Sequence, residues 1–207
     1  MKNSKLLICV AFCAFALAAL AIVMAQDTPK DATTAPANPD ILLIYSSGNV
    51  PAEGQKADAV TCATPKNENV KTLATKLAAA LTEKKISVRL VEATEVKDYK
   101  ELLDAKMIVL ASPAYFSNVS WSMKKMFDER LGPVYSIKEK LNKKPTASLV
   151  YAHAQQSADA ATKIIADTIT TCNGEMKASA TLLLTQTPDE RNAKIAELAE
   201  KIVAAIK

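Results

Sequence analysis

The sequence predicts a doubly wound α/β domain, in which a five-stranded parallel sheet carries helices on both faces. Short apolar runs, typical of buried strands, alternate along the chain with longer segments whose apolar residues recur at helical spacing. Polar stretches containing Gly, Pro or Asn separate these segments. Such alternation is typical of βαβ units, because parallel strands need crossover connections that are usually helical.

The first 25 residues differ from this pattern. Lys2 and Lys5 precede an apolar run over residues 6–24, and Val23-Met24-Ala25 places small residues where a signal peptidase cuts. We therefore predict a secretory signal over residues 1–25 and export to the periplasm or the medium. The apolar run is almost long enough to span a bilayer, so an uncleaved membrane anchor is the alternative.

Residues 26–39 contain three prolines and no apolar periodicity, which predicts a flexible linker before a domain at 40–207. Loss of the signal lowers Lys+Arg from 26 to 24 against 22 Asp+Glu, and charges of both signs intermix along the predicted helices. A solvated surface of this kind does not indicate a nucleic-acid partner.

Two cysteines remain after the signal, Cys62 and Cys172. One disulfide would be permitted in an oxidising compartment. We do not expect it, because Cys62 follows the first strand at one end of the sheet and Cys172 ends a helix that runs to the other. Neither cysteine has the spacing of a metal site, and none is predicted.

The elements follow in order along the domain. Strands are expected at 41–45, 86–91, 107–111, 146–152 and 176–184. Helices are expected from an N-cap near Asn67 to about 81, over 97–104, from beyond 118 to about 130, over 158–172, and from Thr187 to the C-terminus, with a helical turn at 136–142. Pro113 should end the third strand, because proline has no N–H for a sheet ladder.

The stretch between the third strand and the next helix combines aromatic and polar residues. From Ser112 to Trp121 it reads Ser-Pro-Ala-Tyr-Phe-Ser-Asn-Val-Ser-Trp, and Met123-Lys124 and Phe127-Asp128 follow. Three aromatic residues within seven positions are an enrichment that core packing alone does not require. In an open α/β sheet, ligands bind in such a loop because it follows the carboxyl end of a strand.

This stretch resembles the second flavin-binding loop of the flavodoxin-like superfamily. The most similar branch is that of the NADPH-dependent FMN reductases and NAD(P)H:quinone oxidoreductases, whose pattern is Ser-Pro-x-Tyr-Phe-Gly-Asn followed by Ser and Met-Lys. The resemblance covers about eighteen consecutive residues. It implies a three-layer flavodoxin-like fold with strand order 2-1-3-4-5 and FMN as the cofactor.

The resemblance assigns the loop after the first strand, Ser46, Ser47 and Gly48, to the FMN phosphate, which hydroxyls and N–H groups at a helix N-terminus would hold. The sequence departs from the family pattern here. An insertion over 49–66 delays the helix, and Val70 occupies the place of a phosphate-binding hydroxyl. The alternative is an ordinary strand-to-helix connection with a degenerate site.

The resemblance assigns the second loop to the isoalloxazine ring system. The residues concerned are Pro113, Ala114, Tyr115, Phe116, Ser117 and Asn118. The alternative is that Tyr115, Phe116 and Trp121 are core or interface aromatics.

The third loop, residues 152–157, contains His153, the only histidine of the chain. We assign His153 to the pyrimidine edge of the flavin or to the substrate, with a bystander role as the alternative. The chain has no nucleophile elbow or partner signature, which excludes a serine or cysteine hydrolase. No catalytic residue is assigned.

The resemblance thus implies an exported FMN-binding oxidoreductase that passes electrons to a quinone-like or flavin acceptor. Nicotinamide cofactors are scarce outside the cytoplasm, so a membrane quinol or a partner protein is expected as the donor instead of NAD(P)H. Members of this branch often form homodimers or tetramers. The alternative is a flavodoxin-like envelope module that has lost flavin, which the insertion, Val70 and the scarcity of glycine favour.

Overall fold

The computed structural model describes residues 38–47, 69–137 and 140–207. The chain divides into two units, Met1–Ala35 and Pro36–Lys207, and every described residue belongs to the second. The predicted signal, most of the linker, Gly48, the 49–66 insertion and Cys62 lie outside the described residues. None of the described helices has the length and apolar character needed to cross a membrane.

The sheet has the predicted parallel order. Its path is β2-β1-β3-β5-β6, and the short strand β4 pairs only with β3, so the path corresponds to the expected 2-1-3-4-5. The strands are β1 Ile41–Tyr45, β2 Val88–Glu92, β3 Met107–Tyr115, β4 Asn118–Val119, β5 Pro145–Ala152 and β6 Glu175–Leu183.

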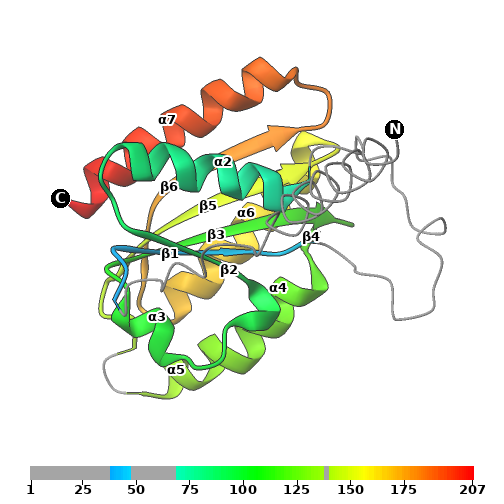
Figure 1. The fold of residues 1–207 in the computed structure, drawn as a ribbon. Helices are drawn as coiled ribbons and strands as arrows, with labels where there is room; N and C mark the ends of the chain where they lie inside the picture. Colours follow the sequence, from blue (N-terminus) through cyan, green and yellow to red (C-terminus); the bar gives the residue numbers. More distant parts are fainter. Residues whose placement is uncertain (1–37, 48–68, 138–139) are drawn as a thin grey trace, which may run out of the picture. The chain divides into compact units, whose positions relative to one another are not determined.

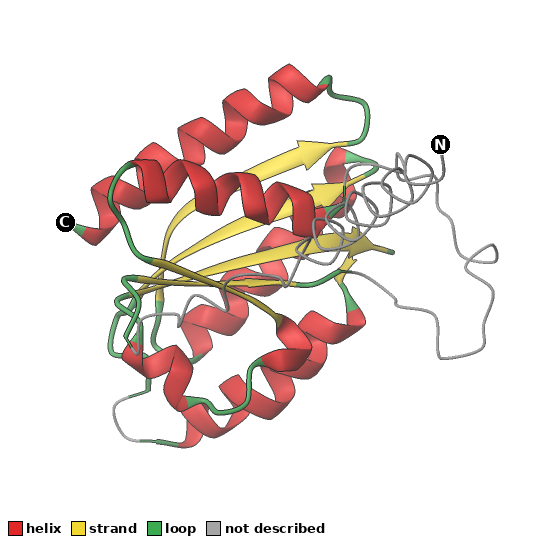
Figure 2. Cartoon of the chain, in the orientation of Figure 1, coloured by secondary structure: helices red, strands yellow, loops and turns green. Residues whose placement is uncertain are grey.

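Helices cover both faces of this sheet, as predicted (Figures 1 and 2). One face carries α2 (Val70–Glu83) and α7 (Pro188–Ile206). The other carries α3 (Lys100–Asp104), α4 (Trp121–Met126), the π-helical segment η3 (Phe127–Leu131), α5 (Gly132–Ser136) and α6 (Gln155–Thr171), and the short 3₁₀ helix η2 (Ala93–Glu95) follows β2. Strand β1 is buried throughout because Ile41, Leu43 and Tyr45 face one helix layer and Leu42 and Ile44 the other.

The two helices on the first face begin at side-chain caps. Asn69, and not Asn67, is the N-cap of α2, and its side-chain oxygen accepts a 3.0 Å hydrogen bond from the Thr72 N–H. Thr187 and Glu190 form a complete capping box at the start of α7, as the sequence suggested. The apolar stripe expected of α2 is buried at Val70, Leu73, Ala74, Leu77 and Leu81.

Strand β3 runs four residues beyond its predicted end, so the prediction that Pro113 stops it is wrong. Ala111 is the last residue paired with β1, and its carbonyl accepts from the Ser46 N–H. Backbone groups alternate between the two neighbours of a strand, so Pro113 faces the side on which β1 has already ended. The missing N–H of Pro113 therefore interrupts no ladder, and pairing with β5 continues from Ser112 to Pro113.

The helix after β3 also continues past its predicted end. The N–H of Gly132 donates to the carbonyl of Phe127, five residues earlier, and this wide turn joins α4 to α5 where a loop was expected. Pro133 is accommodated because it lies in the first turn of α5. Residues 140–143 form a turn and not the expected helix, and Lys140, Asn142 and Lys143 there have positive φ.

Side chains from α7 and its preceding turn cover the outer edge of β6. Leu184 N–H donates to Ala152, so by alternation Thr181 and Leu183 direct their backbone groups away from β5. The Lys194 ammonium donates to the Thr181 carbonyl at 3.1 Å, and the Gln186 side chain accepts from the Leu183 N–H at 2.9 Å. Arg191 donates to the Leu183 carbonyl at 3.2 Å.

Candidate functional site

The predicted site residues lie at the carboxyl ends of β1, β3 and β5, the end of the sheet marked by β4 in Figure 1. This is the end at which open α/β sheets bind ligands. Ser46 and Ser47 follow β1, residues 113–118 form the end of β3 and its continuation into β4, and His153 follows β5. Gly48 lies outside the described residues.

The second loop is a two-residue β-hairpin that the sequence did not predict. Tyr115 pairs with Asn118 and Ala114 with Val119, which leaves Phe116 and Ser117 as the turn. Both turn residues have positive φ, 48° and 60°, the signature of a type I′ turn. Such turns favour Asn-Gly, so a Phe-Ser pair holds its backbone at a cost of about 1 kcal/mol or more per residue.

The aromatic residues of this region are not core residues, so of the alternative considered from the sequence only the role as interface aromatics is left. Phe116 is fully exposed and Trp121 is 64% exposed. Tyr115 is partly buried on the hairpin, and the Lys125 ammonium lies 5.3 Å from the centre of the Trp121 ring. The hairpin therefore presents aromatic surface at the ligand end of the sheet.

A cavity of about 170 Å³ joins the second and third loops. Its wall includes Pro113, Ala114, Tyr115 and Phe116 on one side and His153 on the other, so five of the predicted residues meet there. Ser117 and Asn118 are not in this wall. The Asn118 side chain instead accepts a 2.9 Å hydrogen bond from the Val119 N–H and supports the hairpin.

Four further lining residues were not assigned from the sequence: Tyr151, Ala152, Ser157 and Leu184. Tyr151 is the penultimate residue of β5 and Leu184 directly follows β6, so the strand-end rule would have found both. Ser157 was misplaced because α6 begins at Gln155 and not at 158. The third loop is thus reduced to His153 and Ala154, and Ser157 enters the wall from the first turn of a helix.

A buried serine cluster fixes the hairpin to the end of β1. The Ser112 hydroxyl accepts hydrogen bonds from the Ser46 hydroxyl at 3.3 Å and from the Ser120 N–H at 3.1 Å, and it donates to the Pro113 carbonyl at 2.9 Å. The Ser120 hydroxyl caps α4 by accepting from the Met123 N–H. Ser46, Ser112 and Ser120 have no exposed surface. These hydroxyls therefore act within the scaffold.

The described part of the first loop is less suited to an anion than the resemblance implies. The Ser46 hydroxyl is used by Ser112, and the Ser47 hydroxyl donates to the Glu92 carboxylate at the end of β2. A carboxylate beside Ser47 opposes a phosphate group. Lys71 is a cation close to the end of β1, since its ammonium lies 6.0 Å from the centre of the Tyr45 ring.

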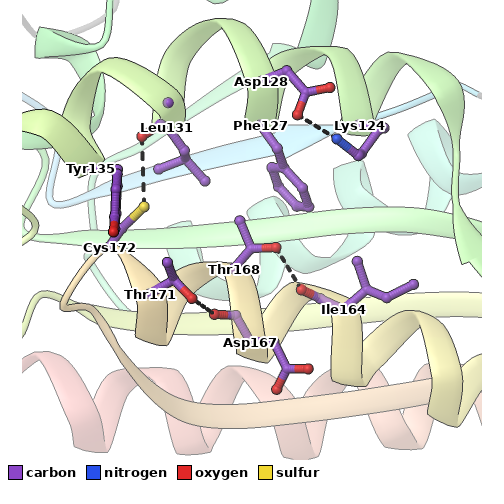
Figure 3. A pocket seen from close by; sticks show the side chains of 11 residues that line it. Lys124, Phe127, Asp128, Leu131, Tyr135, Ile164, Asp167, Thr168, Thr171 and Cys172 are labelled. Carbon is purple, nitrogen blue, oxygen red and sulfur yellow. Dashed lines mark hydrogen bonds and ion pairs between the residues drawn. The ribbon is translucent and has the colours of Figure 1, made fainter.

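A larger cavity of about 440 Å³ lies between the α4–η3–α5 helix and α6 and contains no predicted site residue (Figure 3). Phe127, Leu131 and Ile164 give it apolar walls. The Lys124 ammonium pairs with Asp128 on its own helix, and the Cys172 thiol, which is free and buried, donates to the Leu131 carbonyl at 3.6 Å. Its polar groups are thus largely satisfied within the fold.

The sequence matches no protein-family model and no curated protein. Solved structures do match. A flavodoxin from Streptococcus pneumoniae superposes with a TM-score of 0.58 at 13% identity, over 79% of this chain and 97% of that one. A flavodoxin-type WrbA-like protein from Agrobacterium tumefaciens gives 0.56 at 14% identity, over 81% and 99%.

The domain has the flavodoxin-like fold. Part of a larger protein, a rubredoxin oxygen:oxidoreductase from Desulfovibrio gigas, also superposes on this chain. The TM-score is 0.58 at 14% identity, over 80% of this chain and 35% of that one. At sequence identities this low, similarity to these structures establishes the fold alone, so activity has to be argued from the site.

Proposed function

We propose that this chain is an exported, FMN-binding flavodoxin-like oxidoreductase that passes electrons to a quinone-like or flavin acceptor. The observation that carries the proposal is the cavity between the strained β3–β4 hairpin and His153, where aromatic side chains and backbone meet at the carboxyl ends of two strands. A bound FMN would supply one- or two-electron redox chemistry, and the protein would fix its orientation.

The residues at the ring end suit a flavin. Phe116 and Tyr115 offer aromatic surface, Pro113 and Ala114 also line the cavity, and His153 adds a ring that can donate or accept a hydrogen bond. The buried contacts of Ser112 hold this wall in place before any ligand arrives, which lowers the entropic cost of binding.

A second candidate function is a flavodoxin-like module that has lost flavin and acts in binding at the cell envelope. The contact between Ser47 and Glu92 favours it, because it places a negative charge and an occupied hydroxyl where the phosphate would lie. Residues 48–68, the rest of this loop, lie outside the described residues.

The remaining features of the proposal follow from the sequence. Export, with cleavage before Gln26 or retention as an anchor, rests on the pattern of residues 1–25. An exported protein would draw electrons from a membrane quinol or a partner protein, since NAD(P)H is scarce there. A homodimer or tetramer is proposed from the resemblance of the 112–121 stretch to its branch.

The decisive experiment is a titration of the purified chain with FMN, after its absorbance has been recorded between 350 and 500 nm, roughly the range in which flavins absorb. The proposal expects quenching of FMN fluorescence that saturates at one FMN per chain. A colourless protein that leaves FMN fluorescence unchanged would refute flavin binding and leave the second candidate.

Two substitutions locate the flavin. Phe116→Ala should weaken FMN binding about tenfold by removing an aromatic contact, whereas Tyr135→Ala, another exposed aromatic on α5, should not change it. Glu92→Gln should strengthen FMN binding about tenfold and leave riboflavin binding unchanged, because only FMN carries the phosphate that the carboxylate repels. An equal effect of Glu92→Gln on both ligands would contradict the assignment of the first loop.

A further inference from the structure

A cavity of about 390 Å³ lies at the amino ends of the strands, opposite the hairpin. Its wall includes Lys106, which precedes β3, Lys144 and Pro145 at the start of β5, and the turn at 140–143. The nine residues of β3 separate this end from the hairpin by about 26 Å. Figure 1 shows α3 and the end of α5 toward this end of the strands.

Lysines dominate the wall of this cavity. Lys106 precedes β3, and Lys140, Lys143 and Lys144 belong to one stretch before β5, so the four lysines come from two separate segments; none of the described lining residues is acidic. Acidic groups outside the wall do interact with these lysines. Asp40 pairs with Lys106 at 2.7 Å, and Asp104 and Glu175 act electrostatically on Lys144 and Lys143. The surface that faces the cavity is nevertheless cationic.

The turn that supplies two of these lysines is held firmly. Lys140, Asn142 and Lys143 have φ values of 49°, 47° and 57°, which cost energy in residues other than glycine. The turn keeps this conformation because Leu141 N–H donates to Cys172 at 2.9 Å and Lys143 N–H donates to Asn173 at 2.7 Å. Leu141 itself is buried. The turn is therefore fixed to the end of α6 before any ligand binds.

Lys144 forms the inner part of the wall. Its ammonium donates to the Leu103 carbonyl at 3.0 Å and to the Ala105 carbonyl, and so satisfies acceptors at the end of α3. Burial lowers the pKa of Lys144 from its ordinary value, and the charge of Asp104 opposes this shift. Lys144 thus acts in the scaffold, whereas Lys140 and Lys143 stand on the turn.

Apart from Asn142, the remaining wall is apolar, with Leu103, Ile137, Leu141 and Pro145 beside the lysines. A cationic group of side chains next to an apolar wall complements a ligand that is itself divided into an anion and an apolar part.

We propose that this cavity at the amino ends of β3 and β5 binds a phosphate monoester that carries an apolar substituent. Lys140 and Lys143 contact the phosphate, and the apolar wall contacts the substituent. A soluble phosphate ester and the phosphatidic acid headgroup of a membrane share this chemistry. The proposal does not depend on the flavin site, which lies at the other end of the sheet.

The test is a titration of the full chain with hexyl phosphate. Calorimetry measures the binding, and NMR of the backbone amides locates it. We expect saturable binding at one site, with shifts at the amides of residues 140–145, and affinity at least tenfold higher than for inorganic phosphate. Absence of saturable binding to hexyl phosphate and to vesicles would overturn the proposal, as would shifts confined to other parts of the chain.

Vesicles separate the two sources of the ligand. Vesicles of phosphatidylcholine with about one-third phosphatidic acid should capture the chain if the headgroup is bound, and pure phosphatidylcholine vesicles should not. Binding to hexyl phosphate without vesicle capture supports a soluble ester, and vesicle capture that hexyl phosphate reverses supports the lipid.

Charge variants show whether the cavity is responsible. Lys140→Gln with Lys143→Gln should weaken hexyl phosphate binding at least tenfold, whereas the corresponding pair of Arg substitutions keeps both charges and should stay within about threefold. Lys163→Gln with Lys201→Gln removes the same charge from α6 and α7 and serves as the matched control. An equal loss in this control pair would overturn the proposal, because it would mean binding to net charge.

Thermal unfolding checks that each pair still folds. Phe116→Ala, the test of the flavin site, should bind hexyl phosphate like the parent chain. The two proposals can therefore fail independently.

Discussion

Strands β1 and β3 lie side by side through five residue pairs, yet the loops that follow them differ in how they are held. After β3, hairpin pairing and the buried Ser112 hydroxyl fix the backbone up to the cap of α4. After β1, the Ser46 and Ser47 hydroxyls bond to Ser112 and Glu92 and are not presented to a ligand. The stretch with the family resemblance is therefore held in place by the chain's own contacts.

Among the substitutions that test this difference between the two loops, removal of the Ser112 hydroxyl should have the largest effect on stability. Ser112→Ala leaves the Ser120 N–H and the Ser46 hydroxyl without these partners in a fully buried environment. We expect a loss of about 2–4 kcal/mol in the free energy of unfolding, measured by urea titration.

Ser148 in β5 is the matched control for Ser112. Ser148 is also fully buried, but its hydroxyl has no hydrogen-bond partner among the described residues. Ser148→Ala should therefore leave stability unchanged or raise it by up to about 1 kcal/mol. Similar losses from both substitutions would mean that the serine cluster does not stabilise the hairpin.

The residue before β1, Asp40, forms an ion pair with Lys106, and the stability of the chain should depend on pH through this pair. Hydrogen bonds from Lys106 and then Ser87 lower the pKa of Asp40 from 3.8 to about 2. A lowered carboxyl pKa contributes stability above the unfolded value, and that stability is lost as pH falls from about 4 toward 2. Asp40 is partly solvent-exposed, so we expect a contribution of about 1–2 kcal/mol after screening.

Asp40→Asn should remove this contribution. The variant should be less stable than the parent at pH 7, and the difference should shrink as pH falls below 4 in urea titrations across that range. Glu83→Gln, at the exposed end of α2, is the control. A difference between parent and Asp40→Asn that stays constant from pH 5 to 2 would contradict the role of the ion pair.

The smallest effect concerns the strained hairpin turn. Ser117→Gly should stabilise the chain by about 0.5–1 kcal/mol, because glycine adopts a φ of 60° without steric cost. Lys85→Gly relieves a φ of 64° at the end of α2, far from the hairpin in the sequence, and should stabilise to a similar extent. Thermal unfolding measures both, and destabilisation by Ser117→Gly would show that the serine side chain is needed in the turn.

The sequence predicted those parts of the fold that depend on apolar periodicity. The buried stripe of α2 and the start of α7 follow from the spacing of Leu, Ile and Val and from caps that act locally. The strand order rested on right-handed crossovers and on the family resemblance. The site residues of the second and third loops came from the family resemblance and from their positions after strands, and five of them line one cavity.

Several of the errors share a physical origin, because they depend on contacts with groups that are distant in the sequence. Pro113 could not be placed inside β3 without knowing that β1 ends at Tyr45. The π turn at Phe127–Leu131 and the left-handed turn at 140–143 depend on contacts with α6. The contact of Ser47 with Glu92, which weakens the case for a phosphate site, joins residues 45 positions apart.

The covered edge of β6 restricts how copies of this chain can assemble. An edge strand with free backbone groups invites a further strand, either in an ordered dimer or in an aggregate. Here Lys194, Gln186 and Arg191 already occupy the outward groups of Thr181 and Leu183. Extension of the sheet past the second half of β6 would have to break these bonds, so a homo-oligomer has to associate through other surfaces.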